Sequence, residues 1–257
     1  MLIILPPSET KREPPDSGPV LALSELSFPT LNPARRMVLE ALRTTSAGPD
    51  AFERLRVGPA LVADVARDTH LRDVPTLPVL DVYSGPLHEA LDAASLSSAA
   101  KARADSNLVV ASALWGALRP ADRIPPYRLH VCARLVGVDR LEPLWRSILP
   151  AVLTEAAGER GVILDLRSPM YQAIGKPIGF AERTVTVRVG PAASQGGDVG
   201  NVVAKRTRGL AARYLLESGA DPDDPELVAV ILGEHWPVHL DEPLRPGTPW
   251  TVSIRPT

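Results

Sequence analysis

Proline constrains the fold of this chain more than any other residue, because it occupies 27 of the 257 positions, about twice its average frequency. Each proline fixes its backbone φ angle and lacks the amide hydrogen that helices and sheets use. We therefore expect fixed loops and short helices rather than a long helical bundle. Hydrophobic residues make up 45% of the chain and charged residues 23%, which indicates a globular protein and excludes a disordered or fibrous one.

Patterns of apolar side chains predict both strands and helices. Short apolar runs indicate buried strands at residues 1–5, 108–113 and 161–166. Polar and apolar residues alternate, as in strands with one solvent-facing side, at residues 182–189 and 250–254. Helices are predicted at residues 33–42, 51–70 (as one or two short helices), 88–94, 97–104, 142–157 and 201–217. Loops are predicted at residues 115–120 and 191–200, and the pattern at 79–83 fits a helix or a strand.

This order of elements predicts an α/β or α+β fold, in which helices surround a mixed sheet. The sequence shows no internal repeat and no linker long enough to divide it, so we expect residues 1–257 to form a single domain. The pattern does not fix the strand order or the oligomeric state.

The overall charge gives no general attraction to nucleic acid, because the chain has 28 Lys and Arg residues but 30 Asp and Glu residues. Binding of that kind would need a local basic surface. Cys132 is the only cysteine, so no internal disulfide can form, which fits a reducing cytosol. The sequence has neither a signal-peptide pattern nor an apolar stretch of about 18 residues. We expect a cytoplasmic protein with no membrane partner.

The first candidate site lies just after the predicted strand at 108–113. Gly116 and several prolines fix the backbone of this segment, which carries Arg119, Arg123, Tyr127 and Arg128. Rigid loops at strand ends often hold binding residues. Arginine forks match phosphate, and a tyrosine can stack on a base. A structural interpretation stays open, in which Arg119 pairs with a neighbouring carboxylate and Tyr127 packs in the core.

A basic helix forms the second candidate site. Residues 201–216 hold four basic side chains and no acidic one. Lys205 and Arg208 are three apart and share a helix face, and Gly209 would allow close approach of a backbone or a phosphate. Such a segment suits an anionic ligand, although a solvated helix face would have the same composition.

Two further segments carry polar residues but lack the spacing of a known catalytic motif. Ser8 and Glu9 follow the first predicted strand without the glycines of a phosphate-binding loop. Tyr83 and Ser84 precede a Gly-Pro break and lack the pattern of an esterase elbow. No metal site is expected, because the five histidines are scattered and no cysteine pair exists.

Four segments, taken in order, resemble the YaaA family of peroxide stress proteins. They are Leu5-Pro6-Pro7-Ser8-Glu9-Thr10-Lys11, Asp81-Val82-Tyr83-Ser84-Gly85, the run from Trp115 to Leu129 with its Leu-Arg-Pro and Pro-Tyr-Arg motifs, and Ala204 to Leu210. The resemblance extends from residue 1 to about residue 240. Many members of the family carry Lys in the first segment where Glu9 stands here.

The resemblance implies an unusual α/β fold with a basic cleft and a helix-hairpin-helix-like element. It further implies DNA binding, including duplexes with unpaired regions, and a role in limiting iron-dependent damage by peroxide. The residues of this chain that it assigns to the cleft are Arg119, Tyr127, Arg128, Lys205 and Arg208.

Our leading hypothesis is a DNA-binding protein of the peroxide stress response, with phosphates bound by Arg119, Arg123, Tyr127, Arg128, Lys205 and Arg208. The alternative is an enzyme that acts on a nucleotide, a damaged DNA base or another phosphorylated small molecule in the same cleft, without a cofactor. Its catalytic candidates are Lys205, Tyr127 and Glu9. The residues expected to line the pocket are Ser8, Glu9, Tyr83, Ser84 and Trp115. Both hypotheses require the two basic segments to line a single hollow.

Overall fold

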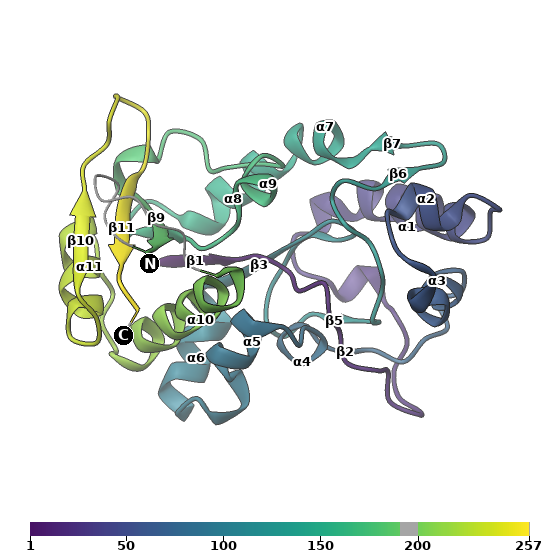
Figure 1. Ribbon diagram of the computed structural model, residues 1–257, viewed down its shortest axis with the longest axis horizontal. Coiled ribbons are helices and arrows are strands. Elements are labelled where there is room, and N and C mark those ends of the chain that lie inside the picture. Colours follow the sequence, from purple (N-terminus) through teal and green to yellow (C-terminus); the bar gives the residue numbers. More distant parts are fainter. Residues whose placement is uncertain (191–199, 257) are drawn as a thin grey trace.

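The computed structural model describes residues 1–190 and 200–256. A seven-stranded sheet with strand order β10–β11–β9–β8–β1–β3–β4 runs through its centre (Figure 1). Its strands are β1 (Leu2–Leu5), β3 (Leu108–Ser112), β4 (Gly116–Leu118), β8 (Ile163–Asp165), β9 (Thr184–Val189), β10 (Val238–Asp241) and β11 (Trp250–Ile254). The inner strands are parallel, and the edge strands β4 and β10 pair antiparallel with their neighbours.

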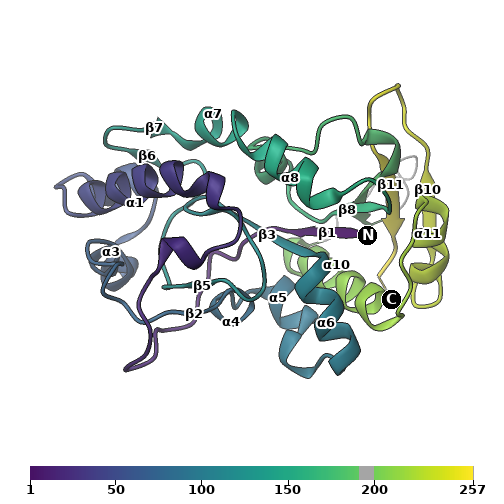
Figure 2. The same ribbon diagram turned by 180° about the vertical axis from the view of Figure 1, so that it is seen from behind.

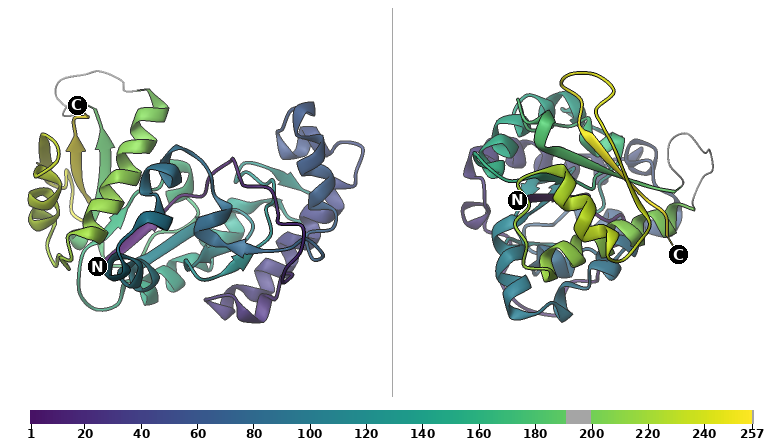
Figure 3. Two further views of the ribbon diagram at one scale, coloured as in Figure 1. Left: turned by 90° about the horizontal axis from the view of Figure 1, so that it is seen from below. Right: turned by 90° about the vertical axis from the view of Figure 1, so that its left-hand side faces the viewer.

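Helices cover both sides of this sheet. One side carries α5 (Pro86–Leu91), α6 (Ser98–Asn107) and α10 (Asn201–Glu217), and the other carries α7 (Leu141–Arg146), α8 (Leu149–Ala157) and α9 (Pro169–Gln172) (Figures 1 and 2). The helix α11 (Pro225–Gly233) lies beside β10. At the other end of the elongated molecule lie α1 (Asn32–Ser46), α2 (Ala51–Leu55) and α3 (Val62–Asp68) (Figure 3).

Short elements connect these parts. They are the helix α4 (Val79–Val82), the two-stranded pairs β2 (Leu77–Pro78) with β5 (Arg123–Ile124) and β6 (Arg134–Leu135) with β7 (Asp139–Arg140), and the 3₁₀ turns η1 (Leu23–Glu25), η2 (Pro29–Leu31), η3 (Pro59–Leu61), η4 (Ala93–Ser95) and η5 (Ala181–Arg183). No helix within residues 1–190 and 200–256 is long and apolar enough to cross a bilayer.

The core forms where the sequence has its continuous apolar runs. All four residues of β1 are buried, since β1 lies between β3 and β8 with helices on both faces. Parallel strands covered on both sides need apolar residues at every position rather than at alternate ones. The predicted mixed α/β architecture is confirmed, as are strands at all five predicted places.

Two predictions of local structure are wrong. Residues 115–120 are not entirely loop, because Gly116 turns the chain with a φ of +75° and the edge strand β4 follows directly. A side chain at 116 would overlap the ring of Trp145. Residues 142–157 form two helices rather than one, since α7 ends at Arg146 and Pro150 lies in the first turn of α8. The predicted loop at 191–200 lies, except for Gly200, outside the described residues.

The order of strands creates a crevice at one edge of the sheet. The chain leaves β1 and places β3 on one side of it, then returns later to place β8 on the other side. In open α/β sheets, ligands bind where the order reverses in this way, beyond the carboxyl ends of the parallel strands. The functional site should therefore lie just after Leu5 and Asp165.

Candidate functional site

A cavity of about 300 Å³ opens at this crevice, and we call it the strand-end pocket. Its walls come from four places: residues 6–10 after β1, residues 166–171 after β8, residues 85–88 at the start of α5, and one face of α10. His130, from the connection between β5 and β6, completes it. A volume of this size suits a small molecule or one nucleotide unit.

The face of α10 supplies the positive charge of the pocket. Asn201, Lys205 and Arg208 all line it, at the i, i+4 and i+7 positions expected for one side of a helix. Lys205 is exposed and makes no ion pair with another described residue. The Arg208 guanidinium is partly buried and donates from Nε and Nη2 to the Val187 carbonyl at 3.3 and 3.2 Å. Burial lowers the pKa of Arg208 from its usual value.

Close packing against α5 sets the position of this helix. A side chain at Gly209 would overlap the carbonyl oxygen of Leu87. The sequence left open whether Gly209 admits a backbone or a phosphate, and the structure places the backbone of α5 against it. Gly209 therefore holds α10 at the distance from α5 that forms the pocket.

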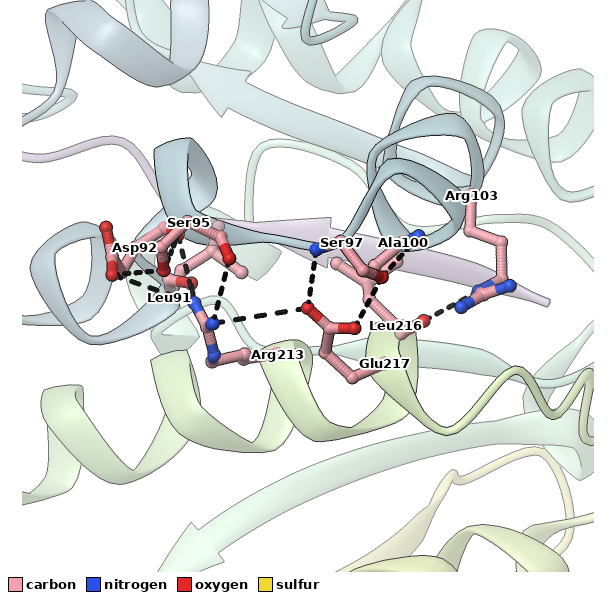
Figure 4. A network of polar contacts seen from close by, with 9 residues as sticks. All are labelled: Leu91, Asp92, Ser95, Ser97, Ala100, Arg103, Arg213, Leu216 and Glu217. Atoms are coloured by element: carbon pink, nitrogen blue, oxygen red, sulfur yellow. Dashed lines mark hydrogen bonds and ion pairs between the residues drawn. The ribbon is translucent and has the colours of Figure 1, made fainter.

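Arg213, the last basic residue of α10, anchors the helix instead of binding a ligand. Its Nη1 donates to the carbonyls of Leu91 and Asp92, both at 3.0 Å (Figure 4). One turn further along, the Glu217 carboxylate accepts hydrogen bonds from Ser97 N and Oγ at 2.9 and 2.6 Å (Figure 4). This network fixes α10 against the connection from α5 to α6.

A carboxylate shares the pocket wall with the basic helix. Glu9 lines the pocket, and its Oε2 lies 3.1 Å from Nη2 of Arg128. Arg128 also donates from Nη1 to the Glu9 carbonyl at 2.8 Å, and from its backbone N–H to Oδ1 of Asp68 at 2.9 Å. His130 Nε2 is 3.8 Å from Glu9 Oε1. Arg128 therefore reaches the pocket only through Glu9, which neutralises it.

The two remaining arginines of the first basic segment point elsewhere. Arg119 donates from Nη1 to the carbonyls of Ser106 and Leu108, at 2.7 and 3.1 Å. Arg123 donates from Nη2 to the Thr76 carbonyl at 2.7 Å. Neither residue lines the strand-end pocket. The expectation that both basic segments line one hollow is therefore wrong. Lys205 and Arg208 of the second segment line the strand-end pocket, whereas Arg128 of the first contacts only Glu9 of its wall.

Three aromatic residues predicted to reach the ligand lie in the core instead. Tyr83 and Tyr127 are each 2% exposed, and their hydroxyls are 2.9 Å apart. The Tyr127 hydroxyl is also 2.7 Å from Oγ of Ser112. Trp115 is fully buried. Tyr127 therefore packs in the core, as the structural interpretation of its segment predicted. Among the predicted pocket residues, Ser8 and Glu9 line the cavity, while Tyr83, Ser84 and Trp115 do not.

Sequence analysis missed His88 and Tyr171, two buried polar residues of the pocket wall. His88 Nε2 lies 3.0 Å from the carbonyl oxygen of Pro6, so this nitrogen must carry the proton. Its Nδ1, and the hydroxyl of Tyr171, have no hydrogen-bond partner among the described residues. Burial lowers the pKa of His88 to about 4, so the ring is neutral. Tyr171 follows the predicted strand at 161–166, but His88 lies in α5, where no sequence pattern marked it as a pocket residue.

Lys11, also unassigned from the sequence, lies directly behind the first wall. Its Nζ donates to the Ser8 carbonyl at 2.9 Å and lies 4.3 Å from the ring centre of Tyr127. Burial lowers its pKa to about 8. No group of three or more potential metal-ligating side chains occurs within residues 1–190 and 200–256.

Comparison with known proteins shows which family this chain belongs to. The model of the family "Peroxide stress protein YaaA" matches residues 1–231. The chain belongs to the YaaA family. It is 41% identical to a UPF0246 protein of Streptomyces coelicolor over 99% of this chain and 98% of that protein. A UPF0246 protein of Corynebacterium efficiens is 40% identical over 74% of each chain, and one of Corynebacterium glutamicum is 34% identical over 90% and 91%.

Membership of the YaaA family confirms the resemblance found in the four sequence segments and places the protein among those named for peroxide stress. Two of those segments, around Ser8 and Lys205, meet in the strand-end pocket. The other two, around Tyr83 and Tyr127, meet behind it in the buried hydroxyl pair. The four segments are thus one spatial unit in this YaaA family member.

Proposed function

We propose that this protein binds DNA in the response to peroxide stress, and that the strand-end pocket accepts one unpaired nucleotide. The observation that carries the proposal is the basic, acid-free face of α10 at a cavity of about 300 Å³, placed where the strand order reverses. A phosphate would lie against Lys205 and Asn201 at the amino-terminal turns of α10. Both the lysine charge and the helix dipole stabilise an anion there.

An unpaired nucleotide suits the pocket better than a duplex does. The cavity takes one unit, and a duplex must expel a base before that base can enter any such cavity. Expulsion costs a few kcal/mol in paired DNA and least where the base is already unpaired. We therefore expect preference for mismatched, looped or single-stranded DNA over a fully paired duplex.

Fluorescence anisotropy with three labelled DNAs tests this proposal: a paired duplex, the same duplex with an unpaired loop, and the single strand. We expect the wild-type protein to bind the last two more tightly and to weaken as salt rises, because phosphate contacts release counterions. Lys205→Ala should weaken all binding. Lys101→Ala, which removes an exposed lysine of α6 outside the pocket, is the matched control. Equal binding by both variants and the wild type would defeat the proposal.

Limitation of iron-dependent damage forms part of the same proposal. A protein seated on an unpaired nucleotide would cover a position exposed to oxidants formed from iron and peroxide. Strand-cleavage mapping with ferrous iron and hydrogen peroxide should show protection at the loop by wild-type protein and none by Lys205→Ala. Protection that is uniform along the DNA, and equal for both proteins, would instead indicate removal of iron from solution.

A second function is favoured by the small volume of the pocket, which fits a free nucleotide or another phosphorylated small molecule. Glu9 and His130 line the pocket together with Lys205 and could act as general acid or base. Calorimetry with mononucleotides, followed by chromatographic detection of turnover, tests this function. Borohydride trapping on abasic DNA separately tests Lys205 as a nucleophile, since only an imine intermediate yields a stable adduct. Absence of turnover and adduct would leave the binding role alone.

A further inference from the structure

Three hollows lie in a row on the surface, and the strand-end pocket is the first. The second, of about 220 Å³, is lined by residues 131–134 together with Arg56, Arg140 and Glu142. Met170 of the first hollow contacts Cys132 of the second, with their sulfur atoms 3.3 Å apart. Residues 130–134 therefore form a continuous edge that leads from the strand-end pocket to the second hollow.

The third hollow, of about 490 Å³, shares Arg56 and Arg134 with the second. These two residues come from different parts of the chain, since Arg56 directly follows α2 and Arg134 begins β6. The shared residues show that the second and third hollows adjoin. A ligand that leaves the strand-end pocket along residues 130–134 would thus meet both arginines.

The residues that line this path carry more positive than negative charge. Most of its acidic groups are already paired: Glu142 with Arg140 at 3.1 Å and Asp50 with Arg54 at 2.5 Å. The side chains of Arg56 and Arg134 are exposed and make no ion pair or hydrogen bond with any other described residue. Glu53, the remaining acidic residue of the third hollow, is also unpaired there. Two free guanidinium groups and one free carboxylate leave a net positive charge.

We propose that Arg56 and Arg134 bind the phosphate backbone of a single-stranded nucleic acid whose terminal or unpaired nucleotide occupies the strand-end pocket. This inference rests on the proposed function and extends it from one nucleotide to a segment. The Ala133 N–H donates to the His130 carbonyl at 2.9 Å, so residues 130–133 form a turn. A turn of this kind spans less than about 7 Å and the next residue adds about 3.8 Å, so residues 130–134 span at most about three stacked nucleotides at about 3.4 Å each. Guanidinium forks match phosphate oxygens in a bidentate manner, so arginine suits this contact.

The second and third hollows suit the phosphate backbone of the single strand rather than its bases. The residues that line the second and third hollows include no aromatic side chain on which a base could stack. Sequence-tolerant stacking needs such faces, whereas phosphate contacts need only charge. The single strand should therefore bind with little dependence on its sequence beyond the nucleotide in the pocket.

Binding of oligothymidylates of increasing length, from about two to about eight nucleotides, tests the inference. Wild-type affinity should rise with length up to about four nucleotides and then level off. Arg56→Gly and Arg134→Ala should each bind the dinucleotide like the wild type but lose about five- to tenfold in affinity for the longer strands. The slope of log affinity against log salt should fall by about 0.7 for each lost phosphate contact.

Arg56→Gly is a clean variant, because Arg56 has a φ of 57° in the left-handed region that glycine adopts without steric cost. Arg160→Ala is the matched control: it removes an exposed arginine next to the amino ends of β1 and β8, at the opposite edge of the sheet. If the wild type binds single strands but shows no gain with length, or both variants keep that gain, the inference is wrong and the proposed function stands. If the wild type binds no single strand of any length, the proposed function itself is wrong, and the inference that rests on it is wrong as well.

Discussion

Glu9 and Arg128 lie 119 residues apart in the sequence, yet Arg128 binds both the carboxylate and the backbone carbonyl of Glu9. This pair fixes the segment after β1 against the segment that precedes β6. It also places a negative charge on the wall of the pocket that Lys205 lines. The charge of the pocket is therefore a balance between Glu9 and α10.

Glu9→Gln should strengthen the binding of anionic ligands. The substitution removes a negative charge from the pocket wall and ends the ion pair with Arg128, while the bond from Arg128 to the backbone carbonyl at position 9 stays. Since Glu9 is exposed, we expect a gain of a few-fold at low salt, which should shrink as salt screens the charges. Titration of a labelled single strand at two salt concentrations measures it. Glu159→Gln, an exposed carboxylate at the other edge of the sheet, should change nothing. An unchanged or lower affinity of Glu9→Gln would show that no anion enters this pocket.

Gly209→Ala should destabilise the protein, because the added methyl group would overlap the Leu87 carbonyl where α10 packs on α5. Overpacking of this kind costs about 1–3 kcal/mol, measured as the free energy of unfolding in urea. Gly233→Ala, near the end of α11, is the control, since nothing lies within 4 Å of the added methyl. It should be neutral or slightly stabilising, because alanine lowers the entropy of the unfolded chain. Equal stability of the two variants would contradict the close packing of α5 and α10.

His88 should make the folded state sensitive to acid. Its pKa falls from 6.5 to about 4 through burial, so the unfolded chain binds more protons between these values. The free energy of unfolding is therefore not reduced by His88 above about pH 6.5. It falls by about 3 kcal/mol as the pH is lowered from 6.5 toward 4. Urea unfolding of His88→Gln across this range should show a weaker pH dependence than the wild type. His70→Gln, at an exposed histidine, should keep the wild-type dependence.

Much of the fold could be predicted because its signals are local. Continuous apolar runs indicate β1, β3 and β8, and the basic helix at 201–217 is found with its predicted bounds. The pocket could be predicted only in part, because helical periodicity relates Lys205 to Arg208 but not either of them to Glu9. Arginines 119 and 123 resembled ligand-binding groups in the sequence. Their bonds to the carbonyls of Ser106 and Thr76 depend on tertiary contacts that no local pattern reveals.

Arg167 should be essential for stability, because it forms a buried bidentate ion pair with Asp165 at 2.8 and 2.7 Å. Its Nη1 also donates to the carbonyls of Tyr171 and Gly175, which holds the pocket wall after β8 in place. Arg167→Met should cost about 3–5 kcal/mol, since it leaves the Asp165 carboxylate buried and unpaired. The double variant Asp165→Leu with Arg167→Met removes both charges and should recover much of that loss in urea unfolding. A single variant that is as stable as the wild type would show that the ion pair contributes nothing to the fold.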